Sequence, residues 1–305
     1  MDLQSKGEAN PWLKSYDDYL RDVVGTTATT RIRYARVIRR FVCACCDDDS
    51  GWAGLSVQTV TDFVCDEAAT KQGRGRGIPL TAVRSFLRFL AWRGAVPSGL
   101  DYAIPRARLA RHASLPRRIS VDQVEQLLEA AKGSKAPIRD RAILLLLVRL
   151  GLRCSEIVAL SIDDLDWRAG LLRVGDNKSR RERKLPLPQD VGAALADYIM
   201  NSRPREVGRD LFIGVNTPPA PFRVPTAITC MVKRCLRRAG LPLGRLSGAH
   251  MLRHTAASGL VNNGASFREV ADLLGHQSLK TTMIYAKLDL PTLAGVSMPW
   301  IGGGL

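Results

Sequence analysis

Apolar residues recur every three or four positions through most of this 305-residue chain, and that spacing predicts a mainly helical fold. Trp12, Tyr16 and Leu20 follow this spacing near the start, and the segment from Ile32 to Cys45 continues it. Ser56 is placed to cap a third helix, because its hydroxyl can accept from an early backbone N–H. The helices predicted in the first hundred residues cover about 12–23, 32–45, 56–64 and 78–92.

The second half of the chain repeats this helical pattern with one interruption. Leu171 to Val174 and Arg183 to Leu187 have the composition of two short strands around a polar turn. Residues 137–150 predict a buried helix that Gly151 ends, and a short helix begins near Cys154. Further helices are predicted to begin at Ser120, near 189, 225 and 248, at Ser266 and at Ser278. We therefore expect a small β-sheet within an otherwise helical second half.

A basic, proline-bounded segment separates the two halves between Pro97 and Pro116. It predicts an all-helical domain at 1–100, a linker at 101–116, an α+β domain at 117–290 and a tail at 291–305. The linker carries Arg106, Arg108 and Arg111. Such a connector suits the backbone of DNA, but a merely solvated linker has the same composition, and the sequence leaves both interpretations open.

The charge of the chain points to a polyanionic partner. Lys and Arg number 45 against 29 Asp and Glu, which leaves a formal net charge of +16. Nucleic acid is the simplest partner for such a surface, and an anionic membrane or plain solvation are the alternatives. The glycines and arginines of KQGRGRGIP, which include Arg74 and Arg76, suit a close approach to phosphate or a flexible loop equally well.

Membrane insertion and secretion are not expected. The longest strongly apolar run, Ala142 to Val148, has seven residues, whereas a membrane-spanning helix needs about 20. The first ten residues lack the basic start and apolar stretch of a signal peptide. With seven cysteines, reduced thiols are expected, and Cys43, Cys45 and Cys46 are interpreted as buried helix thiols rather than zinc ligands.

Two arginines and two histidines suggest phosphate chemistry. When a phosphodiester is attacked, its nonbridging oxygens gain charge, and an arginine fork can bind two of them. Arg153 and Arg253 are candidates for that clamp. His250 lies three residues before Arg253 on the same helical face, and either His250 or His276 can donate hydrogen bonds or move protons.

A lysine and a tyrosine complete this set. Lys178, near the tip of the predicted hairpin, can protonate the leaving 5′ oxygen. Tyr285 can attack phosphorus and hold a covalent 3′-phosphotyrosine. Glu156, one helical turn after Arg153, can orient a catalytic cation. Each residue alone has an ordinary structural explanation, so the functional hypothesis depends on the whole set.

The order and spacing of these segments resemble the tyrosine recombinases, or phage integrases, over roughly residues 10–290. GLRCSEIVALSIDDLD resembles their first box, GDNKSRRERKLPLP their hairpin, HMLRHTAASGLVNNG their second box and LLGHQSLKTTMIYAKL their closing motif. The resemblance implies the catalytic residues Arg153, Lys178, His250, Arg253, His276 and the nucleophile Tyr285, with Glu156 in support. Asn177 and Ser179 depart from the usual G-K-G-x-K-x-R hairpin, and Lys184 is a rival for Lys178.

The resemblance also implies a fold and a setting. It implies a helical core-binding domain of SAM-like type and a mixed catalytic domain that together clamp duplex DNA with paired inverted half-sites. Four protomers, or related recombinases, would exchange strands without a cofactor, ATP or metal, in the bacterial cytoplasm with the nucleoid. The tail would dock on a neighbouring protomer or fold back on its own domain.

Two other functions compete with recombination. A type IB topoisomerase uses similar chemistry and would relax supercoils as a monomer without a specific site. A catalytically silent DNA-binding protein would bind a sequence without cleaving it. The helical first domain argues against a topoisomerase, and the complete set of candidate residues argues against a silent protein. Integration, excision, resolution and transposition are not distinguished by the sequence.

Overall fold

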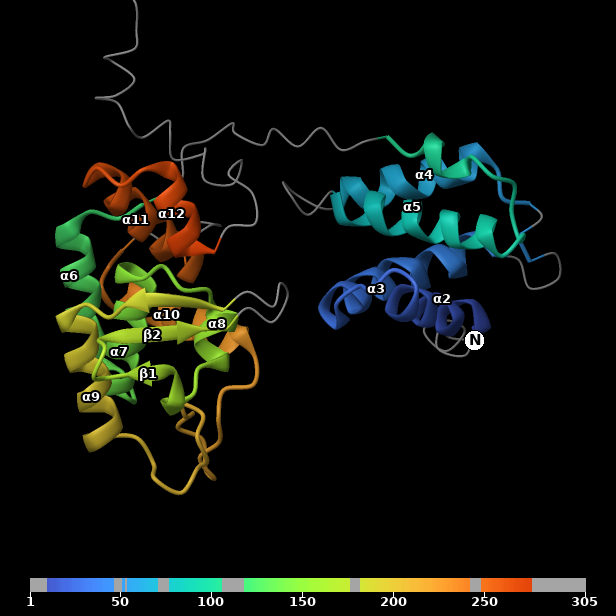
Figure 1. Cartoon of the computed structure of the whole chain (residues 1–305). Coiled ribbons are helices and arrows are strands. Elements are labelled where there is room, and N and C mark those ends of the chain that lie inside the picture. The colour runs from blue at the N-terminus through green and yellow to red at the C-terminus, as the bar shows by residue number, and fades with distance from the viewer. Residues whose placement is uncertain are drawn as a thin grey trace, which may run out of the picture. The chain divides into compact units, whose positions relative to one another are not determined.

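A computed structural model describes residues 10–46, 51–52, 54–70, 77–105, 118–175, 182–241 and 248–275. The chain divides into two compact units, residues 1–111 and 112–305, so the division falls within the expected linker. Most described residues are helical and a single three-stranded sheet lies in the second unit (Figure 1), which confirms the predicted fold class. The helix predicted from Ser278 and the tail at 291–305 lie outside the described residues.

The first unit is built from helices, as predicted. Asn10 caps the first of them by accepting from the Trp12 N–H, and Ser56 caps the third by accepting from Thr59. The third helix continues to Ala69, five residues beyond the predicted end at Val64. The described elements are α2 (Pro11–Asp22), α3 (Ala28–Cys45), α4 (Val57–Ala69), α5 (Gly77–Trp92) and the 3-10 helix η2 (Leu100–Ala103).

Aromatic rings of α5 dominate the core of this unit. The ring of Phe86 lies edge-on to Tyr16 of α2, with centroids 5.0 Å apart. Ile104 is buried in the same core, so residues 101–105, expected in the linker, fold with the first unit. Cys43, Cys45 and Cys46, expected as buried helix thiols, are half-buried. Cys43 and Cys45 belong to α3, whereas Cys46 follows its last residue.

The second unit contains the remaining described helices and the sheet. Its strands are antiparallel in the order β1–β2–β3, with Leu172 opposite Leu185. The two-residue strand β1 was not predicted, because so short a run shows no alternation. The elements are α6 (Val121–Ala130), η3 (Ala131–Gly133), α7 (Pro137–Arg149), α8 (Cys154–Ala159), η4 (Ile162–Asp164), β1 (Leu165–Asp166), β2 (Leu171–Val174), β3 (Arg183–Pro186), α9 (Gln189–Asn201), α10 (Pro225–Arg238), α11 (Ala249–Asn262) and α12 (Phe267–Leu274).

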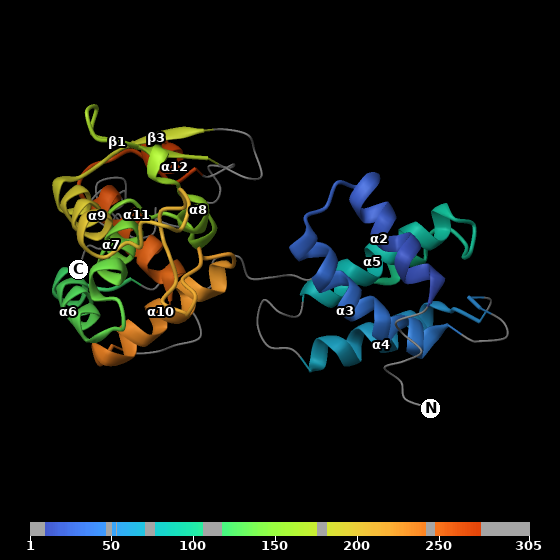
Figure 2. The ribbon, with the colours of Figure 1, turned by 90° about the horizontal axis from the view of Figure 1, so that it is seen from below.

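Helix α7 is the centre of the second unit. It is buried almost all round, as its apolar run predicted, and α9 and α11 pack on it. The sheet lies on one side of α7, and α6 and α10 lie side by side (Figure 2). Alternate strand residues, among them Leu172 and Leu185, turn into this common core. The core therefore fixes both the helices and the sheet that carry the candidate site.

Gly151 ends α7 and turns the chain toward α8. Its φ of +60° lies in the left-handed region, and a Cβ there would meet Leu274 Cδ2 at 2.6 Å. Only glycine satisfies both the backbone angle and the close packing of α12 at this point. The turn brings the start of α8 next to the end of α12.

We predict that Gly151→Ala destabilises the second unit by about 2–6 kcal/mol, since strain at positive φ and overpacking each contribute about 1–3 kcal/mol. Native-state hydrogen exchange of the α7 amides measures this, because it reports on that unit alone. Gly170→Ala is the matched control: its φ is +63°, but nothing lies within 4 Å of the added methyl. Equal losses in the two variants would contradict a packing role for Gly151.

Candidate active site

Four of the predicted site residues lie within the described part of the chain: Arg153, Glu156, His250 and Arg253. The other catalytic candidates, Lys178, His276 and Tyr285, lie outside the described residues. The same holds for the DNA-binding candidates Arg74, Arg76, Arg106, Arg108 and Arg111. The geometry of the site is therefore described for the two arginines, one histidine and the carboxylate.

Arg153 is held at the start of α8 by Glu156. It is the N-cap residue of that helix, with extended backbone angles. The Glu156 carboxylate accepts the Arg153 backbone N–H at 2.7 Å through Oε2 and Arg153 Nη1 at 2.7 Å through Oε1. One carboxylate thus fixes both the main chain and the guanidinium of Arg153, as the spacing of one helical turn suggested.

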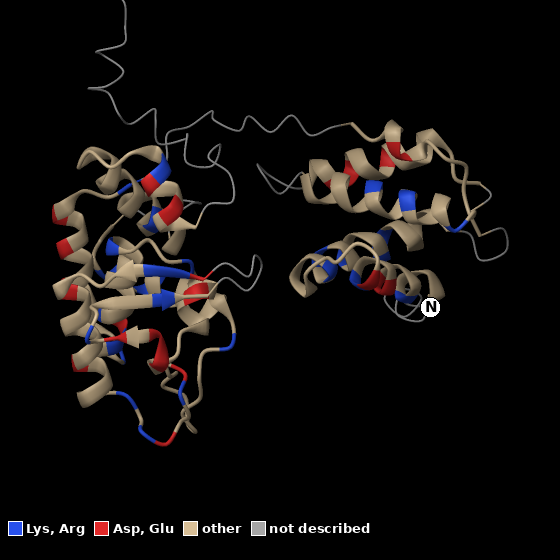
Figure 3. Ribbon diagram, viewed as in Figure 1, with Lys and Arg blue, Asp and Glu red and all other residues tan. Residues whose placement is uncertain are grey.

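The same carboxylate binds a second arginine, Arg183 of β3. Arg183 Nη1 lies 3.1 Å from Oε1 of Glu156, and Nη2 lies 2.9 Å from Oε2. Figure 3 shows the basic stretch of β3 beside the acidic turn of α8. The Glu156 side chain is 5% exposed and that of Arg183 is 14% exposed, so the pair is buried.

Sequence reasoning missed Arg183. The signal was available, because Arg183 occupies the closing arginine of the G-K-G-x-K-x-R pattern. The partner of that arginine was not readable, since Glu156 lies 27 residues earlier in the chain.

Glu156 remains a carboxylate in this setting. Burial by itself raises its pKa, but the hydrogen bonds and charge of Arg183, joined by those of Arg153, outweigh burial and lower the pKa below the usual range. The group therefore carries a full negative charge between two guanidinium groups at neutral pH.

Helix α11 supplies the second arginine and a histidine. Arg253 is only 4% exposed, and its guanidinium donates to the carbonyl of Gly151 and, at 2.5 Å, to that of Leu274. His250, one turn earlier, is exposed, and its ring lies edge-on to His254 with centroids 4.7 Å apart. His254 therefore borders the site without lining its cavity.

Both arginines contact the backbone that closes α12. Arg153 Nη2 donates to the Gly275 carbonyl at 2.9 Å, while Arg253 donates to the preceding carbonyl of Leu274. Gly275 ends α12 in the left-handed conformation, with φ 62°, as the predicted C-cap requires. Side chains from the first and second boxes thus meet the two residues that immediately precede His276 in the sequence.

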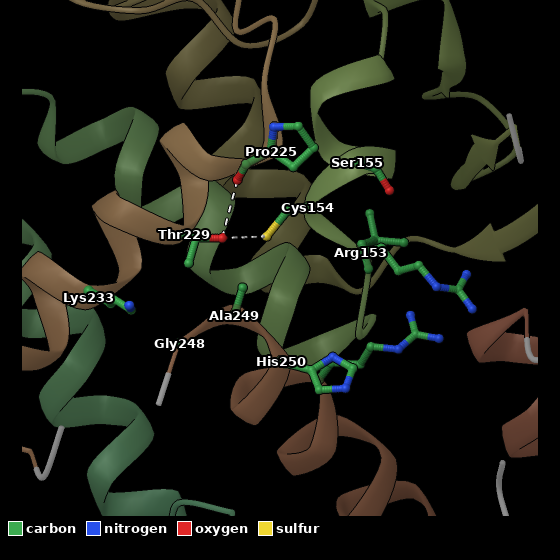
Figure 4. A pocket seen from close by; sticks show the side chains of 11 residues that line it. Arg153, Cys154, Ser155, Pro225, Thr229, Lys233, Gly248, Ala249 and His250 are labelled. Carbon is green, nitrogen blue, oxygen red and sulfur yellow. Dashed lines mark hydrogen bonds between the residues drawn. The ribbon is translucent and has the colours of Figure 1, made fainter. Parts of the chain in front are cut away.

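One cavity of about 530 Å³ opens between α8, α10 and α11. Figure 4 shows the side chains of Arg153 and His250 on one side of it and Lys233 of α10 on the other. No acidic side chain is among the described residues that line it. The residues lining it are Leu152, Arg153, Cys154, Ser155, Pro225, Thr229, Lys233, Gly248, Ala249, His250 and Arg253. A pocket of this composition suits an anion.

Lys184, the rival of Lys178, does not line the cavity that Arg153 and His250 share. It follows Arg183 in β3, and successive side chains of a strand point to opposite faces. Lys184 lines a separate cavity of about 360 Å³ with Asp163, Asp166, Trp167 and Arg173, among others. Since Arg183 turns toward Glu156, Lys184 is directed away from the carboxylate that holds Arg153.

Two other expectations from the sequence concern membranes and metals. Among the described helices, none has the length and apolar content needed to cross a bilayer. Within the same residues, no three His, Cys, Asp or Glu side chains gather at a spacing that would hold a metal ion.

Comparison with known proteins gives the family. The profile of the phage integrase family matches residues 117–290. A putative integrase/recombinase, y4rA, of Sinorhizobium fredii is 39% identical over 95% of this chain and 71% of its own length. The tyrosine recombinase XerC of Mycobacterium leprae is 30% identical over 92% of this chain and 95% of its own length.

Solved structures share the fold at lower identity. The XerH site-specific recombinase bound to a palindromic difH substrate, in a post-cleavage complex, has a TM-score of 0.73 and 19% identity over 93% of this chain and 83% of that one. A lambda integrase tetramer bound to a Holliday junction has a TM-score of 0.70 and 18% identity over 93% of this chain and 80% of that one. With its family profile and these relatives, the chain belongs to the phage integrase family of tyrosine recombinases.

Proposed function

We propose that this chain is a site-specific recombinase that cuts and rejoins duplex DNA through a covalent 3′-phosphotyrosine. The observation that carries the proposal is the convergence of Arg153, His250 and Arg253 on one cavity that no acid lines among the described residues. These side chains come from two sequence boxes about a hundred residues apart, so their meeting is a product of the fold. The guanidinium charges of Arg153 and Arg253 suit a site where an attacked phosphate would gain charge.

The two arginines act as the phosphate clamp. A guanidinium has five N–H donors, and the described bonds of Arg153 to Glu156 and Gly275 use two of them. The others are available to the nonbridging oxygens of the scissile phosphate. Arg253 is more deeply buried and supplies a fixed positive charge close by. Held in place before DNA arrives, these donors stabilise the transition state without reorganisation.

His250 and His276 serve hydrogen bonding and proton transfer. His250 is exposed and lines the same cavity as Arg153, so it can reach a phosphate oxygen or the proton of the attacking group. His276 directly follows Gly275, whose carbonyl binds Arg153.

Tyr285 is the nucleophile in this proposal. Its phenolic oxygen forms a bond to phosphorus while the bond from phosphorus to the 5′ oxygen breaks. The phenol passes its proton to a neighbouring base, for which His250 or His276 is suited, and Lys178 gives a proton to the departing 5′ oxygen. The phosphotyrosine conserves the bond energy. A 5′ hydroxyl of the partner strand then attacks it and releases Tyr285, so strand exchange needs no ATP.

The partner is double-stranded DNA with paired inverted half-sites. The relatives with solved structures include a recombinase bound to a palindromic site and an integrase tetramer bound to a Holliday junction. We assign the same mode to this chain, with four copies or related recombinases assembled on two sites. The first unit binds the DNA backbone, and the candidate contacts are Arg74, Arg76, Arg106, Arg108 and Arg111. The catalytic domain at 117–290 performs the reaction. The tail at 291–305 docks on a neighbouring protomer or on its own domain.

Integration, excision or transposition of a mobile element is the setting we propose, with the protein acting at the bacterial nucleoid. The relatives described above are integrases and recombinases, which favours strand exchange over topoisomerase activity or silent DNA binding. Supercoil relaxation by a monomer on any sequence would favour the topoisomerase, and binding without cleavage would favour the silent protein.

We predict that Tyr285→Phe keeps DNA binding and forms no covalent protein–DNA adduct, because the attacking oxygen is absent. The assay uses a nicked suicide duplex that carries paired inverted half-sites, with adducts resolved on denaturing gels. A wild-type yield of adduct from this variant would remove Tyr285 as the nucleophile.

We predict that Lys178→Met slows cleavage by about 10²–10⁴-fold, the usual contribution of a general acid. Replacing the leaving 5′ oxygen by sulfur should restore the rate, since a thiolate departs without a proton. Lys184→Met is the matched control and should cleave both substrates normally, because Lys184 lines the separate cavity. If sulfur rescued Lys184→Met instead, the assignment of Lys178 would be wrong.

A further inference from the structure

Three segments distant in sequence meet around Glu156 and Arg153: the start of α8 and strand β3 at the carboxylate, and the end of α12 at the Arg153 guanidinium. Arg183 binds both carboxylate oxygens. The Arg153 guanidinium binds one of them, its backbone N–H binds the other, and its Nη2 also binds the Gly275 carbonyl. A methyl group at Gly275 would collide with the Arg183 guanidinium, so the contact is closely packed. Arg183 therefore lies behind Arg153, joined to it through the carboxylate.

The charges of this group do not cancel. The Glu156 carboxylate carries one negative charge, and it is shared between the two guanidinium groups of Arg153 and Arg183. The group of three keeps one net positive charge. With Arg183 removed, Glu156 and Arg153 would form a neutral pair, and the attraction of Arg153 for phosphate would weaken.

We infer that Arg183 is a positioning residue for the reaction: it holds the Glu156 carboxylate so that Arg153 presents a fixed guanidinium with its charge intact. The inference rests on the proposed function, which it deepens by adding a residue that does not itself touch the DNA. Arg183 also fastens the outgoing strand of the hairpin segment that contains Lys178 to the helix that begins at Arg153.

The bidentate geometry explains why arginine stands here. Both Nη groups of Arg183 face both oxygens of Glu156, which fixes the plane of the carboxylate. A lysine would retain the charge but offer a single ammonium in place of the fork. Arg183→Lys should therefore retain part of the rate enhancement that Arg183 provides, whereas Arg183→Met should retain none of that enhancement.

The first test measures single-turnover cleavage of the nicked suicide duplex by the full-length protein at saturating concentration. We expect Arg183→Met to cleave about 10- to 100-fold more slowly, the range known for groups that orient metal ligands, with little change in DNA affinity. Arg183→Lys should lie between this variant and the wild type. Lys184→Met, on the opposite face of the same strand, is the control and should behave as the wild type.

The second test asks whether Arg183 acts through Glu156. The double variant Arg183→Met with Glu156→Gln should be no slower than the slower single variant, because removing both partners breaks the same linkage and leaves Arg153 with its positive charge. Independent losses that multiply would overturn the inference.

The pH dependence provides a readout that a purely structural role would not change. Arg183 from β3 and Arg153 at the start of α8 are the charged groups that face Glu156 among the described contacts. Without Arg183, burial raises the pKa of Glu156, so protonation occurs at higher pH and cleavage by Arg183→Met falls at a higher pH than in the wild type. Glu156→Gln in the same background should abolish that added acid limb.

The outcomes separate the inference from the proposed function. If the wild type forms no adduct, the recombinase proposal fails before Arg183 is tested. If the wild type forms adduct and Arg183→Met has the same rate and the same pH profile, the positioning role of Arg183 is wrong. If Arg183→Met does not fold, the cleavage rate and pH profile of Arg183→Lys test the positioning role instead. A wild-type rate and pH profile from Arg183→Lys would then show that the role is wrong.

Discussion

The buried carboxylate of Glu156 is the contact on which the candidate active site depends. An isolated charge in the interior is costly, and breaking one member of a buried pair costs about 3–5 kcal/mol. Here two guanidinium groups share one carboxylate, and a backbone N–H adds a further hydrogen bond. The arrangement compensates the buried negative charge and joins a helix start to a strand, so catalytic geometry and local stability arise from the same bonds.

The core of the second unit places that carboxylate. Helix α7 is buried on nearly every side, so its end at Gly151 is a fixed point. From there α8 carries Arg153 and Glu156, while α11 packs on α7 and carries His250 and Arg253. The sheet joins the same core through residues such as Leu185, which follows Arg183 by two positions. A close-packed interior thereby fixes the relative positions of polar side chains from segments that lie far apart in the sequence.

Much of this could be predicted from the sequence. Helical spacing, the caps at Ser56 and Ser120, and the break at Gly151 are local signals, and each predicted element in the described residues is present. The motifs predicted that Arg153, Glu156, His250 and Arg253 belong together, and their side chains do gather at one site. Arg183 was beyond this reasoning because its role depends on a strand lying beside α8, a tertiary contact without a local pattern. The carbonyl partners of Arg253 were unpredictable for the same reason.

The end of α12 has a consequence for how like charges are kept together. The last carbonyls of a helix carry the negative end of its macrodipole, equivalent to about half an elementary charge. At Leu274 and Gly275 that partial charge falls on the guanidinium groups of Arg153 and Arg253. Half a charge eases the repulsion between two neighbouring cations, whereas a second carboxylate in its place would have neutralised one of them. The resting protein can thus keep two cations close together with a helix end standing in for a counterion, and their electrostatic pull on an incoming polyanion is largely preserved.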